Sequence, residues 1–231
     1  MKSMENRQGA VANAEGLVDL MQGRADTYRL LARLYRRELA EEDLDVLHDM
    51  MFPADSANAD IDAGYRLIAT YLSNLWCESA EELQIDYVRC FVGHGEDTYG
   101  AAFPFESVYT SPKRLLMQDA RDKVLAIYRA CGLDKSDDWR EGEDHIALEL
   151  EFMAFMAQRC SEALAEGRND KACELLETQL KFLEGHLLVW TPMLTADMRK
   201  FAKSELYLGL SYLTDGFLAD DAACIKGVVA A

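Results

Sequence analysis

The sequence contains no C-x-x-C pair and no apolar run long enough to cross a membrane. Its six cysteines and four histidines are scattered, and none of them has the spacing of a zinc site. The first residues lack the apolar region of a signal peptide. These absences predict a cytoplasmic protein with free thiols, no metal, no cofactor and no stable insertion into a membrane.

Positive charge is also scarce. The 231 residues include 41 acidic side chains against 24 Lys and Arg, so the formal net charge is -17. Such a field repels phosphates, which argues against nucleic acid and anionic membranes as partners. A cationic partner would fit the charge, although acidity of this degree also serves solubility alone.

Patterns typical of strands and of common enzymes are missing as well. No segment alternates apolar and polar residues over the length of a strand, and there is no Walker A sequence, G-x-S-x-G elbow, H-E-x-x-H or Glu-x-x-His pair. Ser107 could be drawn into a triad with Asp144 and His145. Adjacent Asp and His residues cannot readily place the acid on the far ring nitrogen, so we expect a protein that is not an enzyme.

Helical periodicity covers most of the chain. Half of the residues are hydrophobic, and apolar side chains recur at spacings of three and four, which predicts an all-α, single-domain bundle of roughly eight or more helices. Residues 1–22 are expected to form a flexible or short-helix N-terminal segment, and residues 23–231 the helical domain. The expected helices cover residues 26–39, 41–51, 58–76, 80–91, 112–131, 144–166, 169–190 and 198–225.

Three boundaries of these helices depend on particular residues. Ser111 and Pro112 are typical of an N-cap and a first helical residue, so the helix over 112–131 should begin there, with Leu115 and Leu116 on its inner face. Pro192 should end the helix that begins at 169. The last helix should be broken around residues 215–216.

The connection between residues 91 and 109 is unusually long for a helical bundle. It opens with Gly93-His94-Gly95 and closes with Pro104 and the run Phe105-Glu106-Ser107-Val108-Tyr109. A loop of roughly 15 residues is more than helix packing needs, and such loops are usually functional or disordered. The aromatic residues favour an ordered loop, which is either a recognition loop or a well-packed irregular connection.

Two histidines lie beside other notable side chains. His145 follows Asp144 at the first turn of the helix over 144–166 and precedes Glu149 by four residues, so His145 and Glu149 share a face and could pair. The same pattern fits a histidine that merely begins a helix. His186 and Trp190 lie one turn apart and are best interpreted as a pair that packs against the helix over 144–166.

Three pieces of the sequence together resemble the TorD/DmsD/NarJ-type chaperones that mature molybdenum-containing redox enzymes. The pieces are Tyr87-x3-Phe91-x-Gly93-x-Gly95 with Pro104 to Tyr109, then Glu143-Asp144-His145-Ile146 leading into Glu149-Leu150-x-Phe152-Met153, and lastly Phe182-Leu183-x2-His186-Leu187-x2-Trp190. The resemblance covers residues 25 to 215. The chain departs from the family at His94, Phe103 and Glu143, where family members often carry proline.

The resemblance implies a cytoplasmic chaperone that binds the twin-arginine signal peptide, or leader, of an apo-molybdoenzyme, and sometimes its body. Such a chaperone holds its client back from export until the molybdopterin cofactor is inserted. The leader-binding surface would lie on the loop 91–109 and the Asp144-His145 turn. The candidate peptide-binding residues are Tyr87, Phe91, Pro104, Phe105, Glu106, Tyr109, Asp144, His145, Glu149, His186 and Trp190.

The chemistry of these residues suits such a peptide. Glu106, Asp144 and Glu149 could accept the two guanidinium groups, and the aromatic residues could floor a groove for the apolar part. Two other classes stay open, namely a helical scaffold or assembly factor that acts on the mature subunit of a redox complex, and a nucleotide-binding helical enzyme. Both a monomer and a domain-swapped dimer are compatible with the sequence.

Overall fold

The computed structural model describes residues 2–53, 55–93 and 100–230, with side chains from residue 15 onward. This part of the chain is helical and contains no β-strand, only an isolated bridge between Phe105 and His145, so the prediction of an all-α fold is confirmed. The elements are α1 (Lys2–Arg36), α2 (Glu41–His48), α3 (Ala59–Ser73), α4 (Ser79–Tyr87), the π-helical turn η1 (Val88–Val92), α5 (Glu106–Thr110), α6 (Asp119–Ala130), α7 (Ile146–Ala165), α8 (Asn169–Phe182), the π-helical turn η2 (Leu183–Leu187), α9 (Leu188–Phe201) and α10 (Glu205–Val229).

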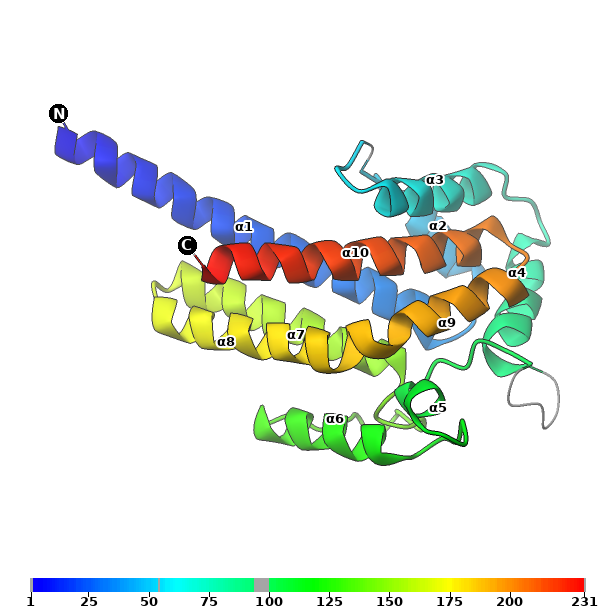
Figure 1. The fold of residues 1–231 in the computed structure, drawn as a ribbon. Coiled ribbons are helices and arrows are strands. Elements are labelled where there is room, and N and C mark those ends of the chain that lie inside the picture. The colour runs from blue at the N-terminus through cyan, green and yellow to red at the C-terminus, as the bar shows by residue number, and fades with distance from the viewer. Residues whose placement is uncertain (1, 54, 94–99, 231) are drawn as a thin grey trace.

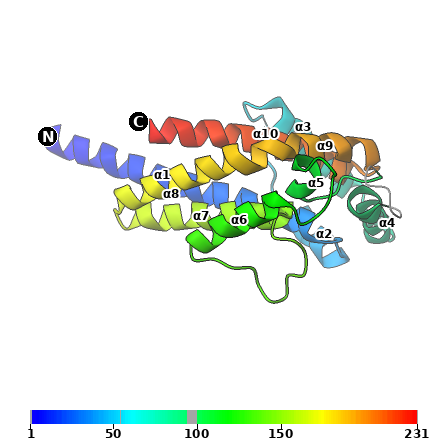
Figure 2. The same ribbon diagram turned by 60° about the horizontal axis from the view of Figure 1, so that its bottom comes forward.

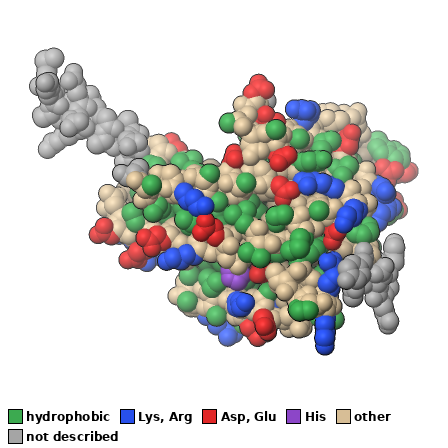
Figure 3. All heavy atoms as spheres, viewed as in Figure 1, with side chains coloured by type: hydrophobic (Ala, Val, Ile, Leu, Met, Phe, Trp, Pro, Cys, Tyr) green, Lys and Arg blue, Asp and Glu red, His purple; other side chains and the backbone are tan. Residues whose placement is uncertain are grey.

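The long helices form a bundle, with α1 packed along α7, α8 beside α7, and α10 between α3 and the rest (Figure 1). Helix α7 is central, as the sequence predicts, because Ile146, Leu150, Met153 and Ala157 on one of its rows are all fully buried. On the face that Figure 3 shows, acidic side chains gather where α7 leads into α8. None of the described helices combines the length and apolar character that crossing a lipid bilayer requires.

Helix α1 runs across residue 22 without a break. The division of the chain at that position, into an N-terminal segment and a helical domain, therefore stays a prediction. Of the long connection after η1, residues 94–99 lie outside the described residues, and with them His94 and Gly95 of the first family motif. Gly93 ends η1 with a φ of 75°, a conformation that glycine adopts most readily.

The expected break near residues 215–216 is wrong, because α10 is continuous. Gly216 instead allows α3 to approach, since a Cβ atom at this position would lie 2.8 Å from the backbone nitrogen of Ile61. The same is true at Gly64 on α3, where a Cβ atom would lie 2.6 Å from the backbone nitrogen of Leu213. The glycines of α3 and α10 therefore mark a close helix crossing rather than a helix end.

The expected start at Pro112 is also wrong, because α6 begins seven residues later, at Asp119. Arg114 and Met117 have φ values of 51° and 57°, which no right-handed helix can contain. Leu115 and Leu116, predicted to be internal, are 44% and 49% exposed. The segment between α5 and α6 is therefore an irregular turn with apolar side chains on its surface.

Pro192 does not end its helix as expected but lies inside α9. The turn directly before α9 is the π-helical turn η2, whose wider hydrogen-bonding pattern is a common accommodation of an irregularity in a helix. The helix over 169–190 in the sequence analysis is thus a chain of three elements, α8, η2 and α9. His186 lies in η2 and Trp190 in the first turn of α9.

Candidate functional site

The exit of the long connection is fixed against the first turn of α7. Phe105 forms the isolated bridge with His145, the Glu106 N–H donates to the carbonyl of Asp144 at 3.0 Å, and the Ile146 N–H donates to the carbonyl of Pro104 at 2.9 Å. These backbone bonds bring two of the three family motifs together. Helix α5 then begins at Glu106, so its side chain faces the start of α7.

Three carboxylates meet at this junction inside the protein. Glu106, Asp144 and Glu149 are 4%, 0% and 0% exposed. Glu106 Oε2 lies 2.9 Å from His186 Nδ1, Asp144 Oδ2 accepts a hydrogen bond from the Ser107 N–H at 2.9 Å, and Glu149 Oε2 accepts one from Trp190 Nε1 at 3.1 Å. The second oxygens of two of these acids, Asp144 Oδ1 and Glu149 Oε1, are buried without a hydrogen-bond partner.

The environment of Asp144 and Glu149 disfavours the charged forms of these two acids. Burial raises the pKa of Glu149 well above its ordinary value, and the neighbouring Glu106 raises it further. Burial also raises the pKa of Asp144. A buried carboxylate oxygen that lacks a hydrogen-bond partner lowers the stability of the folded protein by about 1–3 kcal/mol or more. A ligand that supplies hydrogen-bond donors or positive charge to the cluster would remove this cost.

His145 is the N-cap of α7, because its Nδ1 accepts a hydrogen bond from the Ala147 N–H at 3.1 Å. Burial lowers the pKa of this imidazole to about 3, and the charge of Arg36 contributes to the same shift. The ring packs edge-on against Phe105 and Trp139. The pairing with Glu149 that the spacing suggested does not form, since the ring is turned to its capping role.

The aromatic candidates separate into two groups. Tyr109 stacks on Trp190 with the ring centroids 5.7 Å apart, and Trp190 in turn donates to Glu149, so these two belong to the carboxylate cluster. The contact of Trp190 with α7 also confirms the expected packing of that helix pair. Tyr87 and Phe91 lie elsewhere, in an aromatic group with Tyr35 and Tyr207 in the core.

The structure therefore brings most of the predicted residues together but buries them, whereas a groove floored by aromatic residues had been predicted from the sequence. A cavity of about 320 Å³ reaches the cluster from outside at Glu106. It lies between α5 and the start of α6 on one side and η2 with α9 on the other, and Pro112, Ala120, Gly185 and Val189 are among its lining residues. The carboxylates of Asp144 and Glu149 do not line this cavity.

Tyr128 belongs to this site, although it was not among the candidate residues predicted from the sequence. Its ring lies 5.1 Å from that of Phe152 and 6.1 Å from that of Phe182, and its hydroxyl donates to the carbonyl of Glu143 at 3.3 Å. Burial raises the pKa of the phenol well above its ordinary value, and the carboxylates of Glu149 and the other nearby acids raise it further. The signal was present, since Ala120, Val124 and Tyr128 follow at intervals of four, but the helix start predicted at Pro112 put Leu115 and Leu116 on the inner face instead.

Glu143, which stands where family members often have proline, is a second missed residue. It forms an ion pair with Arg121 and another with Lys135, the latter at 3.1 Å. Burial opposes its ionisation, but the two cations outweigh that effect and lower the pKa of Glu143 to about 2. Within the described part of the chain, no group of three or more His, Cys, Asp or Glu side chains is arranged to hold a metal ion.

Comparison with known proteins places these features in a family. The model of the nitrate reductase delta subunit family matches residues 55–196, a range that includes every candidate residue from Tyr87 to Trp190. The chaperone protein TorD of Vibrio parahaemolyticus serotype O3:K6 is 24% identical over 208 residues, which cover 88% of this chain and 95% of that protein. The protein of the same name from Vibrio cholerae serotype O1 is 26% identical over 212 residues, covering 89% and 93%.

A third relative, the chaperone protein TorD of a Psychrobacter species, is 25% identical over 215 residues, which cover 90% of this chain and 94% of that protein. The similarity thus extends over nearly the whole length of both chains. The resemblance that the three sequence motifs indicated is confirmed at the level of the family. Since its model matches more than half of the residues, the chain belongs to the nitrate reductase delta subunit family.

Proposed function

We propose that this protein is a cytoplasmic chaperone that binds the twin-arginine leader of a molybdenum-containing oxidoreductase before the enzyme receives its cofactor, with no catalytic role of its own. The family of this chain, and the TorD chaperones that match the chain over nearly their whole length, support a role in the maturation of such an enzyme. The observation that carries the leader-binding part is the buried carboxylate cluster, where Asp144 and Glu149 each keep one oxygen without a partner.

A leader arginine supplies what the cluster lacks. The guanidinium group is planar, stays charged at all physiological pH values and presents five N–H donors, so it can satisfy two carboxylate oxygens at once. Each charge-assisted hydrogen bond contributes about 1.5–3 kcal/mol when shielded from water. Ordering a disordered leader costs about 2–5 kcal/mol, so the net affinity should be near micromolar and reversible, as a holding chaperone requires.

Titration of a fluorescently labelled twin-arginine leader into the wild-type protein and an Asp144→Asn variant tests this proposal. The asparagine keeps an oxygen for the Ser107 N–H, so the fold should persist, while the loss of the negative charge should weaken binding by about tenfold or more. Asp49→Asn is the matched control, because the Asp49 side chain is 89% exposed. Equal affinities of all three proteins for the leader would show that Asp144 is not part of the binding site. Failure of every leader to bind would refute the proposed function.

A second function, a helical assembly factor that acts on the mature subunit of a redox complex, is favoured by the description of the family as a reductase subunit. Deletion of the leader from the client separates the two functions. Capture of the client by this protein should then be lost if the leader is the ligand, and undiminished if the mature subunit is the ligand.

A further inference from the structure

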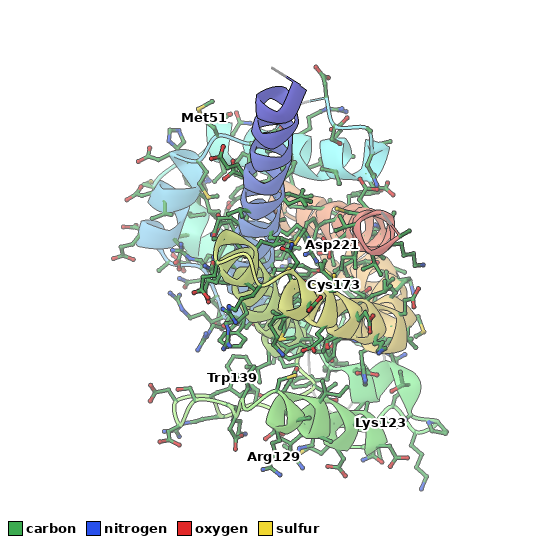
Figure 4. The ribbon with its side chains drawn as sticks, turned by 90° about the vertical axis from the view of Figure 1, so that its left-hand side faces the viewer. Met51, Lys123, Arg129, Trp139, Cys173 and Asp221 are labelled. Carbon is green, nitrogen blue, oxygen red and sulfur yellow. The ribbon has the colours of Figure 1, made fainter. Side chains whose placement is uncertain are left out.

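Helix α6 is held to the bundle by few interactions. It lies at the edge of the bundle beside α5, below α7 and α8 in Figure 1 and in front of α7 in Figure 2. Its buried side chains are Ala120, Val124 and Tyr128, and Arg129 lies on the side away from the bundle (Figure 4). Among the described residues, no hydrogen bond or ion pair joins α6 to α7, α8 or α9, since its polar contacts run to neighbouring residues and to Asp134 and Glu143.

Hollows lie on both flanks of α6. The cavity of about 320 Å³ separates its N-terminal half from Gly185 and Val189. A second cavity, of about 250 Å³, is lined by Tyr128 and Leu133 on one side and by Phe155 of α7 on the other. A void deprives the side chains around it of packing partners, so an interface interrupted in this way opens at a lower cost than a continuous one.

The polar bonds of residues 119–143 are mostly internal to this segment. Glu143 receives the ion pairs of Arg121 and Lys135, and its carbonyl accepts the Tyr128 hydroxyl. Residues 119–143, which we call the α6 flap, can therefore move without losing these bonds. Apart from the buried row of α6, Trp139 ties the flap to the bundle, because it packs on His145 and lies 5.2 Å beneath the guanidinium of Arg36. The Gly142 carbonyl also accepts the His145 N–H at 3.3 Å, and the flap adds three partly buried side chains that pack on the core, those of Ile127, Cys131 and Leu133.

Tyr128 fills the place where the flap meets the carboxylate cluster. Its ring packs against those of Phe152 and Phe182, and its hydroxyl donates to the Glu143 carbonyl, directly before Asp144. One hydroxyl group cannot satisfy both Asp144 Oδ1 and Glu149 Oε1, and its single donor is used by the Glu143 carbonyl. A guanidinium group is also planar and stacks on aromatic faces, and it has five donors where the phenol has one.

We propose that the α6 flap closes the peptide site of this protein, and that an arginine side chain of the bound peptide displaces Tyr128 from it. The occupant is an arginine in a mainly apolar segment, which would place its guanidinium group between Asp144 and Glu149 and its neighbours in the apolar space that the flap vacates. This inference rests on the proposed function. It adds that Asp144 and Glu149 become accessible to the peptide only after α6 has moved.

Rapid mixing of the protein with a labelled twin-arginine leader tests this order of events. If opening precedes binding, the observed rate should level off as the leader concentration rises, at the rate at which the flap opens. Tyr128→Leu keeps an apolar side chain but loses the aromatic contacts, so the limiting rate and the affinity should both rise roughly threefold to tenfold. Arg129→Ala, on the outer face of the same helix, is the matched control and should leave both unchanged.

A second variant and a measurement on the free protein distinguish an opening of the flap from a folding defect of Tyr128→Leu. Val124→Ala loosens the flap without touching the carboxylates and should change binding in the same direction as Tyr128→Leu. In the free protein, the amide hydrogens of α6 should exchange with solvent at least about tenfold faster than those of the central part of α7.

Three results would overturn the inference. They are unchanged or weaker leader binding by both variants while they remain folded, a binding rate that rises linearly without a limit, and exchange of α6 as slow as that of α7. Wild-type binding of the leader together with any of these would leave the proposed function standing. Absence of leader binding by every variant would remove the proposed function and the inference with it.

Discussion

His145 caps α7 with a ring nitrogen that must stay unprotonated. The folded-state pKa is about 3 because the ring is buried, against about 6.5 in an unfolded chain. Above pH 6.5 both states are neutral and the full stability is present. Below it the unfolded chain gains a proton that the folded protein excludes, so the free energy of unfolding falls by up to about 1.4 kcal/mol per pH unit until the pH nears the folded value.

A His145→Asn variant should lose this pH dependence. Asparagine is a good N-cap, so it can accept the hydrogen bond of the Ala147 N–H. Between pH 6.5 and 5 the wild-type protein should lose about 2 kcal/mol more unfolding free energy than the variant. Urea denaturation at a series of pH values measures the difference, and parallel curves would show that His145 titrates normally in the folded protein.

Glu149 should oppose stability and support binding. Its buried oxygen lacks a partner, and burial with the nearby Glu106 raises its pKa. Glu149→Gln keeps an oxygen for Trp190 and removes the charge, so the free energy of unfolding at pH 8 should rise by about 1–3 kcal/mol while leader affinity falls. Glu151→Gln, half-exposed on the same helix, should change stability by no more than about 0.5 kcal/mol. Loss of stability in Glu149→Gln would contradict this account.

The pairing of His145 with Glu149 that their spacing suggested does not form, whereas the contact of Trp190 with α7 was predictable from the sequence. The burial of Glu106 and Glu149 was not, because charged side chains are usually exposed. The partners of these two acids, His186 and Trp190, also lie 80 and 41 residues away from them in the sequence. A similar limit applies to Tyr87 and Phe91. Their spacing indicated one helical face, and the spacing alone cannot say that this face meets Tyr35 and Tyr207 instead of the acids.

At the scale of the elements, the crossing of α3 and α10 depends on glycine. Gly64→Ala would place a Cβ atom within 3 Å of both the Leu213 backbone and the Gly209 carbonyl, so the helices must separate, at a cost of about 1–3 kcal/mol. Gly23→Ala in α1 is the matched control, because no atom lies within 4 Å of its added methyl group. It should stabilise the protein by about 0.5–1 kcal/mol. Thermal unfolding of the two variants should shift in opposite directions, and equal shifts would refute the crossing.

Helix periodicity predicted the elements better than their ends. The range predicted for helix α7, 144–166, contains its whole length and exceeds it by two residues at the start and one at the end, because its apolar rows are wide and uninterrupted. The boundaries expected at Ser111-Pro112, Pro192 and Gly216 were wrong, since these residues have the types that often begin or end helices but none of them does so here. A proline can continue a helix beside a π-helical turn. A glycine can allow the close approach of a helix that lies about 150 residues away in sequence, as Gly216 does for α3, and no local pattern indicates this.

At the scale of the whole molecule, one buried ion pair joins three distant helices. Arg24 of α1 forms an ion pair with Asp221 of α10 and donates to Gln179 of α8 at 2.8 Å, and Tyr28 donates to Asp221 at 2.6 Å. Arg24 and Asp221 are 5% and 3% exposed. Such a network fixes the register of the helices relative to one another more than it adds stability.

Removal of one partner should nevertheless be severe. Asp221→Ala leaves the Arg24 charge buried without its counterion, so the free energy of unfolding should fall by about 3–5 kcal/mol. Asp26→Ala, which breaks the exposed pair with Arg29, should cost less than about 1 kcal/mol. Chemical denaturation compares them, and similar losses would show that the buried pair is no more important than a surface one.

The π-helical turn η2 determines the direction in which the side chains of α9 point. Each residue rotates an α-helix by about 100°, so one additional residue in a turn changes the direction in which all later side chains point. His186 within the turn and Trp190 beyond it thereby both reach acids, Glu106 and Glu149, that belong to different helices. A homologue whose alignment shows a one-residue gap at this turn would aim other side chains at the same acids, and such a gap is therefore the place to look for a change of client.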